Sequence, residues 1–133
     1  MEKDQQELIF KLSMFEQQMQ QMQQQLQAVE QGITELNMLN RGLDDLKSSV
    51  NRDILAPIGR GVFAKAKLLS EDLVVDIGNK TLIKKTIPET QKIINEQTEK
   101  LEEVKIELNN NLQDLGGEFN KIILESRQIK EKE

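Results

Sequence analysis

The chain lacks both cysteine and histidine, and the two absences exclude several kinds of chemistry. None of its 133 residues is Cys or His. Without cysteine there is no disulfide framework, no thiolate metal site and no cysteine nucleophile. Without histidine the chain has neither the commonest general base nor the commonest metal ligand of proteins. The sequence therefore predicts a protein that is not an enzyme and that needs no cofactor and no metal ion.

Large aromatic side chains are also scarce. The chain has four Phe, no Trp and no Tyr, while charged residues make up 31% of it. Because aromatic residues supply much of the apolar area of a thick core, a bulky globular core is not expected. A composition rich in Gln, Glu, Lys and Leu instead indicates long helices that bury a narrow seam. The length is that of one domain.

Long apolar runs and clustered basic charge are missing as well. No apolar segment approaches the ~18 residues of a membrane span, and the first residues, MEKDQQE, do not resemble a secretory signal. The net charge is −5, whereas nucleic-acid affinity comes mostly from clustered Lys and Arg. We therefore expect a cytoplasmic protein that binds neither a membrane nor a nucleic acid.

Residues 5–53 carry the pattern of a coiled-coil helix. Apolar residues recur in alternating steps of four and three over four heptads, which is the a/d pattern of a coiled coil. They are Leu8, Leu12, Phe15, Met19, Met22, Leu26, Val29, Ile33 and Leu36. The next heptad position is the polar Asn40, and the apolar residues continue at Leu39, Leu43, Leu46 and Val50. This spacing predicts a local rotation of the seam.

Residues 88–130 carry the pattern of a second helix of similar length. Pro88 suits its first turn, and Glu89 suits the positive end of its dipole. The predicted seam, with one irregular step, contains Ile94, Gln97, Leu101, Val104, Leu108, Leu112, Leu115, Phe119, Ile122 and Ile129. Gly116-Gly117 indicates either a close packing site or a bend. The two helices should run antiparallel, each about 65 Å long.

Between the helices, residues 54–87 carry a strand pattern. Short β-branched runs at 54–58, 62–69, 73–77 and 81–86 predict two hairpins that turn at Gly59-Arg60-Gly61 and Gly78-Asn79. Hairpins this small are not stable alone and leave open edges, so we expect them to pair with other chains into an obligate oligomer. The expected assembly residues are Ile54, Pro57, Ile58, Gly59, Gly61, Val62, Phe63, Val74, Val75, Ile77, Gly78, Leu82 and Ile83.

The far ends of the two helices carry more apolar residues than a seam can use. Consecutive apolar residues occur at 8–10 and at 122–124, and antiparallel pairing brings these runs together. Exposed apolar patches usually mark interaction sites, although each run is also compatible with a broad coiled-coil end. The predicted binding residues are Leu8, Ile9, Phe10, Met14, Phe15, Ile122, Ile123 and Leu124.

The order helix, two hairpins, helix resembles the alpha class of prefoldin subunits, over nearly the whole chain. The most specific segments are PIGRGVF at 57–63 and DIG at 76–78, before a hairpin that ends in lysines. Two hairpins point to the alpha class, because the beta class has one. The compact length and the lack of cysteine are similar to archaeal subunits. The implied fold is α+β, dominated by helix: an antiparallel two-helix coiled coil whose hairpins join an intersubunit β-barrel.

The resemblance implies partners and a function. It implies a hexamer of two alpha and four beta subunits that captures unfolded polypeptides at the coiled-coil tips. The capture needs no ATP, and the clients are delivered to a group II chaperonin. A different class of function also remains open: a scaffold or tether whose arms bind one fixed folded partner.

Overall fold

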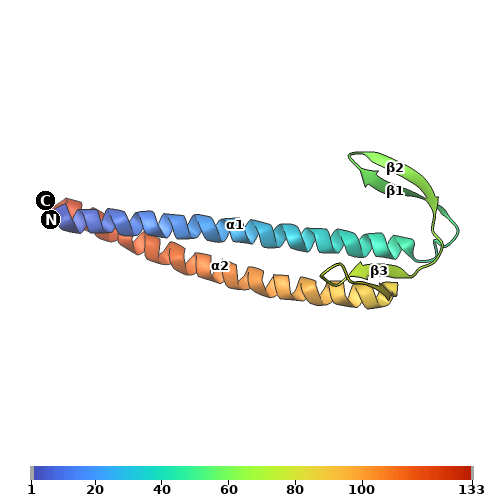
Figure 1. Cartoon of the computed structure of the whole chain (residues 1–133). Helices are drawn as coiled ribbons and strands as arrows, with labels where there is room; N and C mark the ends of the chain where they lie inside the picture. The colour runs from blue at the N-terminus through green and yellow to red at the C-terminus, as the bar shows by residue number, and fades with distance from the viewer. Residues whose placement is uncertain (1, 133) are drawn as a thin grey trace. The chain divides into compact units, whose positions relative to one another are not determined.

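The computed structural model describes residues 2–132, and the side chains of residues 2–128. The elements are α1 (Glu2–Leu46), β1 (Asp53–Gly59), β2 (Val62–Lys67), β3 (Leu73–Asp76), β4 (Leu82–Lys85) and α2 (Ile87–Lys132) (Figure 1). Two long helices with two small antiparallel hairpins between them confirm the predicted fold class. The residues group into two compact units, one of residues 1–33 with 100–133 and one of residues 34–99.

In the first unit, the N-terminal part of α1 packs along the C-terminal part of α2. Leu8 and Ile33 are its buried residues. A Cβ added to Gly32 would lie only 3.2 Å from Leu101 Cδ1 of the other helix, so the lack of a side chain there permits a close approach. Lys105 Nζ lies 3.9 Å from Glu30 Oε1 across the pair. The side chain of the predicted seam residue Ile129 lies outside the described residues.

The second unit has a small core where the two helices meet the hairpins. Leu43, Ile87 and Ile94 are buried there, and the partly buried Leu36, Leu46 and Leu73 pack against them. Leu73 is the first residue of β3, so the second hairpin is attached to the helices through its own apolar face. Burying an aliphatic side chain of this size contributes about 1.5–3 kcal/mol.

The predicted rotation of the seam occurs later than expected, because the three-residue step that replaces a step of four runs from Leu43 to Leu46, and both residues pack in the core. Leu39 and Val50 are exposed, whereas Asn40 is partly buried. The steps of four and three continue through Leu36, Asn40 and Leu43. Asn40 Nδ2 donates a hydrogen bond to Asn95 Oδ1 of α2 at 2.8 Å. Because this bond gives the amide a partner on the other helix, a polar residue is accommodated in the seam.

In α2 too, the seam contains polar residues in place of some that the sequence pattern predicts. Gln97 and Val104 are exposed, and the partly buried positions beside them are Thr98 and Lys105. With these residues in the seam, the steps from Ile94 to Ile122 are regular, and the predicted irregular step disappears. The Thr98 hydroxyl is satisfied within α2, because it donates to the Ile94 carbonyl at 2.8 Å.

Gln91 links the helices next to Asn40. Its Nε2 donates to Asp44 Oδ1 at 2.7 Å, and it lies 3.4 Å from the Asn40 carbonyl oxygen. The hydrogen bond from Gln91, and then that from Lys47, lowers the pKa of the Asp44 carboxyl. Asn40, Gln91 and Asn95 therefore form a polar layer between the apolar parts of the seam.

Replacing Asn40 with leucine should stabilise the chain by about 1 kcal/mol. Asn40 Oδ1 is buried without a hydrogen-bond partner, and the substitution removes it. Asn95 is exposed, so water replaces its lost partner. The midpoint of thermal unfolding measures the effect. Asn37→Leu, at an exposed position of α1, is the matched control and should change little. A lower midpoint for Asn40→Leu would show that the Asn40–Asn95 hydrogen bond stabilises the chain by more than the unsatisfied Asn40 Oδ1 destabilises it.

Both helices have different ends from those predicted. α1 ends at Leu46 rather than near residue 53, because Ser48 and Asn51 adopt φ of 63° and 68°, which a right-handed helix does not permit. The Ser48 amide donates to Glu71 Oε1 at 2.6 Å. α2 begins at Ile87, and the Glu89 amide donates to Thr86 Oγ1 at 3.2 Å. Thr86 is therefore an N-cap.

The four strands form two separate two-stranded sheets. β1 pairs with β2 from Asp53 opposite Lys67 to Gly59 opposite Val62, with a bulge between Pro57 and Gly59. β3 pairs with β4 from Leu73 opposite Lys85 to Asp76 opposite Leu82. The second turn is centred on Asn79-Lys80, one residue later than predicted, with φ of 51° and 61°. Two positive φ values are typical of a type I′ hairpin turn.

Gly116 and Gly117 lie in the middle of a continuous helix. A Cβ added at either glycine would meet nothing within 4 Å, so the alternative of a close packing site is wrong. Replacing both with alanine should stabilise α2 by about 1 kcal/mol per residue. Circular dichroism during thermal unfolding measures this. Gly32→Ala is the matched control, because its Cβ would crowd Leu101 and stabilise less. Equal gains in thermal stability at all three sites would show that the room available for a Cβ does not decide the effect.

Candidate functional site

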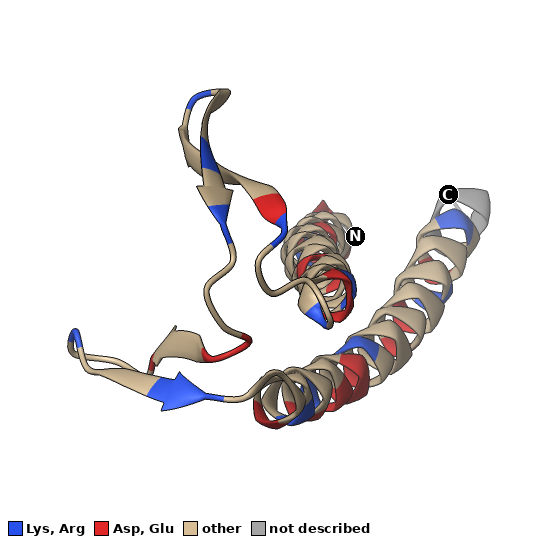
Figure 2. Cartoon of the chain, turned by 90° about the vertical axis from the view of Figure 1, so that its right-hand side faces the viewer, with Lys and Arg blue, Asp and Glu red and all other residues tan. Residues whose placement is uncertain are grey.

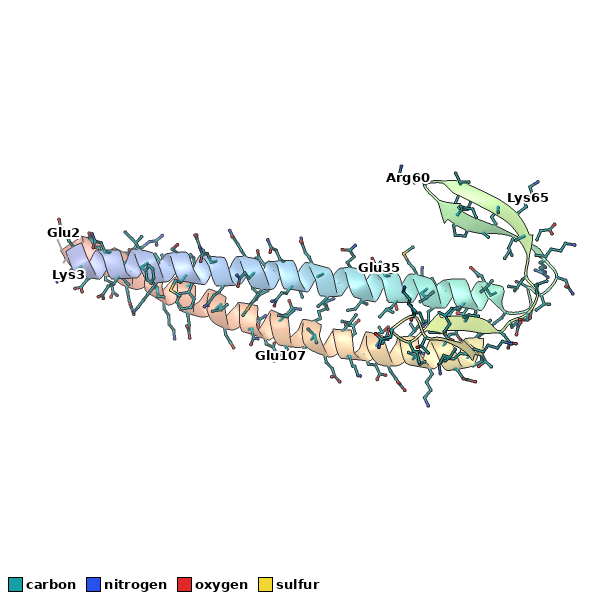
Figure 3. All side chains as sticks on the ribbon, in the orientation of Figure 1. Glu2, Lys3, Glu35, Arg60, Lys65 and Glu107 are labelled. Atoms are coloured by element: carbon teal, nitrogen blue, oxygen red, sulfur yellow. The ribbon has the colours of Figure 1, made fainter. Side chains whose placement is uncertain are left out.

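The residues that the sequence singles out form apolar surfaces. Among the residues that the structure describes, no group of three or more Asp, Glu, His or Cys side chains is arranged to hold a metal ion. Nor does either helix, over its described part, contain a segment apolar and long enough to cross a membrane. Exposed apolar residues occur at the end of the helix pair that holds the chain termini and on the hairpins. Figure 3 draws the described side chains along both helices and on the hairpins, where Arg60 and Lys65 are labelled.

The first predicted surface begins on the first turns of α1. Leu8 is buried and Phe15 is partly buried, as their seam positions require. Ile9 and Phe10 are 65% and 66% exposed, and Met14 is 46% exposed. Phe10 and Met14 are four residues apart, so they are neighbours on one face of the helix. This end of α1 therefore presents apolar area that its partner helix does not cover.

The matching part of α2 is less exposed. Ile122 and Ile123 are partly buried, and Leu124 is 57% exposed. Gln5, Leu8 and Ile9 of α1 line one hollow together with Ser126 of α2. The two predicted runs of apolar residues therefore lie side by side in the structure.

The exposed residues point in three directions around the helix pair. Phe10 and Leu124 each follow a seam residue by two positions, which turns them about 200° away from the seam. They therefore face outwards on opposite helices. Ile9 and Ile123 each follow a seam residue by one position. In an antiparallel pair this places both on the same side of the seam, where Ile9 lies against Ser126.

The other side of the seam is polar at this end. A second hollow is lined by Asp4, Glu7, Leu8 and Lys11 of α1 and by Glu125 of α2. The apolar surface of the helix ends is thus one-sided around the seam and extends over the outer faces of both helices. We call Ile9, Phe10, Met14, Ile123 and Leu124 the tip surface.

The first hairpin carries the second predicted surface. Side chains of a strand alternate between its two faces. Ile54, Ala56, Ala64 and Ala66 lie on one face and are partly buried, whereas Leu55, Pro57 and Phe63 lie on the other and are exposed. Ile58, Gly59, Gly61 and Val62, at the bulge and the turn, are exposed too. This hairpin therefore presents a largely uncovered apolar face.

The second hairpin is half covered. Leu73, Val75 and Ile83 lie on the partly buried face that packs towards the helices. Val74 and Leu82 lie on the opposite face and are exposed, as are Ile77 and Gly78 at the turn. The Asp76 carboxylate accepts a hydrogen bond from the Gly78 amide at 2.9 Å, which stabilises this turn. One apolar face of each hairpin is therefore free.

Sequence reasoning missed several exposed apolar residues. Leu55 is 63% exposed on the free face of the first hairpin, and Met38 and Ile106 are exposed on the helices. The alternation of β1 was the signal for Leu55, because it shares a face with Pro57 and Phe63. Met38 stands two positions before the polar seam residue Asn40, and Ile106 stands one position after Lys105, so their exposure follows only from the correct seam.

Comparison with known proteins gives consistent matches. A family model described as prefoldin subunit matches residues 15–132. A prefoldin subunit alpha of Methanobrevibacter smithii is 27% identical over 124 residues, covering 92% of this chain and 85% of the relative. That of Methanosphaera stadtmanae is 28% identical over 71% of this chain and 67% of its own length. That of Methanococcus maripaludis is 30% identical over 77% of this chain and 70% of its own length.

A solved structure is similar to the fold. It is a filamentous prefoldin of Methanocaldococcus jannaschii determined by cryo-electron microscopy, with a TM-score of 0.74 and 19% identity. The alignment covers 86% of this chain and 96% of that one.

Proposed function

Because the chain belongs to the prefoldin family of chaperones, we propose that it is an alpha-type subunit that captures unfolded polypeptides at the tip surface without ATP. The captured clients are then delivered to a group II chaperonin. The observation that carries the proposal is the exposure of Ile9, Phe10, Met14 and Leu124 around the same end of the helix pair. Exposed apolar groups of this kind bind the apolar segments that a non-native chain displays.

The arrangement of the tip surface suits clients without a fixed shape. Its residues point in several directions, so no single rigid pocket is formed. Ile9 and Phe10 are neighbours in sequence yet diverge around the helix, and Met14 is a flexible side chain that adapts to many partners. Each contact is weak alone. Several subunits that hold one client together bind it much more tightly through multivalency.

We further propose that the hairpins join several subunits. The family forms hetero-oligomers of prefoldin subunits, and for this chain we propose two copies with four beta subunits around paired β-barrels. The free apolar faces at Leu55, Phe63, Val74 and Leu82 support this, because an isolated two-stranded hairpin is marginally stable in water. The similar solved structure is described as filamentous, so the alternative assembly is a filament.

Suppression of aggregation tests the function. The purified chain, alone and with a candidate beta subunit, is added to several unrelated denatured proteins, and light scattering follows their aggregation. A holdase protects all of them without ATP. A scaffold that binds one folded partner protects none, and that result would reject the proposal. The mass of the same preparations separates the proposed hetero-oligomer from a filament.

A further inference from the structure

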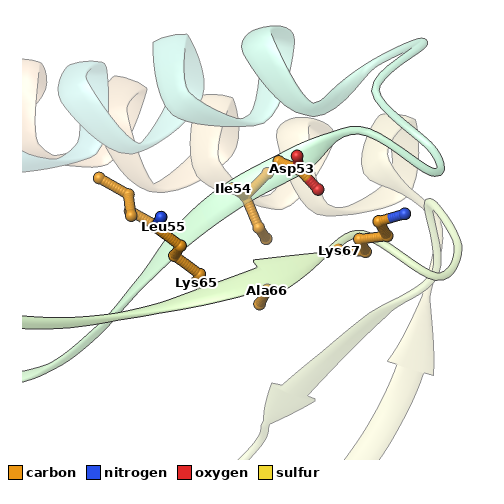
Figure 4. Close-up of a pocket in the computed structure, with 6 residues that line it drawn as sticks. All are labelled: Asp53, Ile54, Leu55, Lys65, Ala66 and Lys67. Carbon is orange, nitrogen blue, oxygen red and sulfur yellow. The ribbon is translucent and has the colours of Figure 1, made fainter.

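Two short segments, residues 47–52 and residues 68–72, connect the first hairpin to the rest of the chain. The first leads from α1 into β1, and the second leads from β2 into β3 (Figure 2). Leu55 and Phe63 of this hairpin are exposed. Its own strands line a shallow hollow, which is formed by Asp53, Ile54, Leu55, Lys65, Ala66 and Lys67 (Figure 4). The direction of the hairpin therefore depends on the two segments rather than on apolar packing against the helices.

The two segments are linked to each other at two levels. On the hairpin side, the Asn51 amide donates to the Leu68 carbonyl oxygen at 2.8 Å, and the Leu68 amide donates to the Arg52 carbonyl oxygen at 3.3 Å. On the helix side, the Ser48 amide donates to Glu71 Oε1 at 2.6 Å. Along both segments the two levels are three residues apart. A single link lets the hairpin turn about it, whereas two links at different levels oppose such a rotation.

The first segment has an unfavourable backbone conformation. Ser48 and Asn51 have φ of 63° and 68°, in the left-handed region that is disfavoured for residues other than glycine. Hydrogen bonds surround them, because the Ser49 amide donates to the Leu46 carbonyl oxygen at 3.1 Å and the Arg52 amide to the Ser49 carbonyl oxygen at 3.0 Å. Such a conformation persists only where its surroundings determine it. Loss of the contact to Ser48 should therefore release the segment.

The hydrogen bond between Ser48 and Glu71 joins two anchored parts of the chain. Ser48 lies two residues after the end of α1. Glu71 lies two residues before Leu73, which packs against the core at the hairpin end of the helices. A carboxylate is a strong acceptor, and hydrogen bonds to ionised groups are short, as this one is. Both residues are exposed, so the bond can be removed without opening the core.

We propose that the Glu71 carboxylate, by holding the Ser48 amide, fixes the direction of the first hairpin relative to the hairpin end of the helices. Glu71 is thus a positioning residue. The proposal concerns a single chain and depends neither on assembly nor on the capture of clients. One consequence rests on the hairpin assembly proposed above: Leu55 and Phe63 are presented in a fixed direction, and groups ordered in advance lose less entropy on binding.

Distances between two spin labels test the proposal, because a chain without cysteine can be labelled at chosen sites. Arg60→Cys places one label in the turn of the first hairpin, and Glu96→Cys places the other on α2. Both positions are exposed. The labelled chain is diluted with unlabelled chain, so that pulsed electron paramagnetic resonance measures distances within one chain. The original chain should give one narrow distance, and Glu71→Ala should replace it with a broad range.

Three matched controls separate the hydrogen bond from other effects of the substitution. Glu71→Gln keeps an acceptor oxygen at the same place and should retain the narrow distance. Asp72→Ala removes the neighbouring exposed carboxylate and should change nothing. Labels at Arg41→Cys and Glu96→Cys report on the two helices alone, and their distance should stay the same in every variant.

Amide hydrogen exchange gives a second readout at Ser48. Its amide should exchange at least about tenfold faster in Glu71→Ala, because a hydrogen bond to a charged group is lost. The proposal is overturned if the original chain shows a broad range of distances or if Glu71→Ala keeps the narrow one. It is equally overturned if Glu71→Gln or Asp72→Ala broadens the distances as Glu71→Ala does. Broadening between the two helix labels in Glu71→Ala would overturn it too, because Glu71 would then stabilise the helix ends instead.

Discussion

Replacing Ile9, Phe10, Met14 and Leu124 together with serine should remove most of the protein's ability to keep a denatured client from aggregating. These side chains are 46–66% exposed, so their loss should change the helix content little. Each contributes a weak contact, and multivalent binding multiplies the loss across subunits. At least about tenfold more of the variant should be needed to protect the same amount of client.

Light scattering of an aggregating client, with circular dichroism for helix content, checks this result. The matched control replaces Met38, Leu39, Val104 and Ile106 with serine. These are also exposed apolar residues of α1 and α2, but they lie away from the tip surface, near the C-terminal end of α1 and in the middle of α2. The control should protect clients as well as the original chain does. If both variants lose activity equally, clients bind to exposed apolar residues anywhere on the helices. The tip surface then has no special role.

Replacing Ile87 with alanine should cost about 2–5 kcal/mol of the free energy of unfolding. Ile87 is 1% exposed and packs with Leu43 and Ile94, and the small core around them offers few side chains that can refill the cavity. Domains have total stabilities of about 5–15 kcal/mol. This single change should therefore remove a large part of the stability.

Urea unfolding at equal protein concentration measures the loss. Ile106→Ala is the matched control, because Ile106 lies on the same helix and is 60% exposed. Its expected effect is within about 0.5 kcal/mol. Similar losses for the two variants would show that the core of Leu43, Ile87 and Ile94 does not hold the hairpin end of the helices together.

Most of the fold could be predicted because two periods in the sequence are strong. The steps from Leu8 to Leu36 identify the first helix, and the alternation in β1 and β2 with the glycine turn identifies a hairpin. The seam around Asn40 cannot be located from the apolar residues alone. Helix geometry determines which residue faces the partner, and Asn40 faces it despite being polar. Its partner Asn95 is 55 residues away, a pairing that no local pattern reveals.

The exposed residues of the tip surface could also be predicted, because three consecutive apolar residues cannot all face one neighbour. What could not be predicted was their direction. Phe10 and Leu124 face outwards on different helices, whereas Ile123 is partly buried. That distinction depends on the packing of the two helices. The exposure of Leu55 depends likewise on which face of the first hairpin remains uncovered.

The glycine pair in α2 has a consequence for the populations of conformers. Two glycines with open space around them weaken the helix by about 2 kcal/mol relative to alanine. This increases the fraction of molecules with a locally opened helix up to about 30-fold. Amide hydrogen exchange should therefore be faster in residues 118–128 than in residues 101–115. For the proposed capture of clients, a more frequently opened helix would present Leu124 in more than one arrangement, and a client would need to match only one of them.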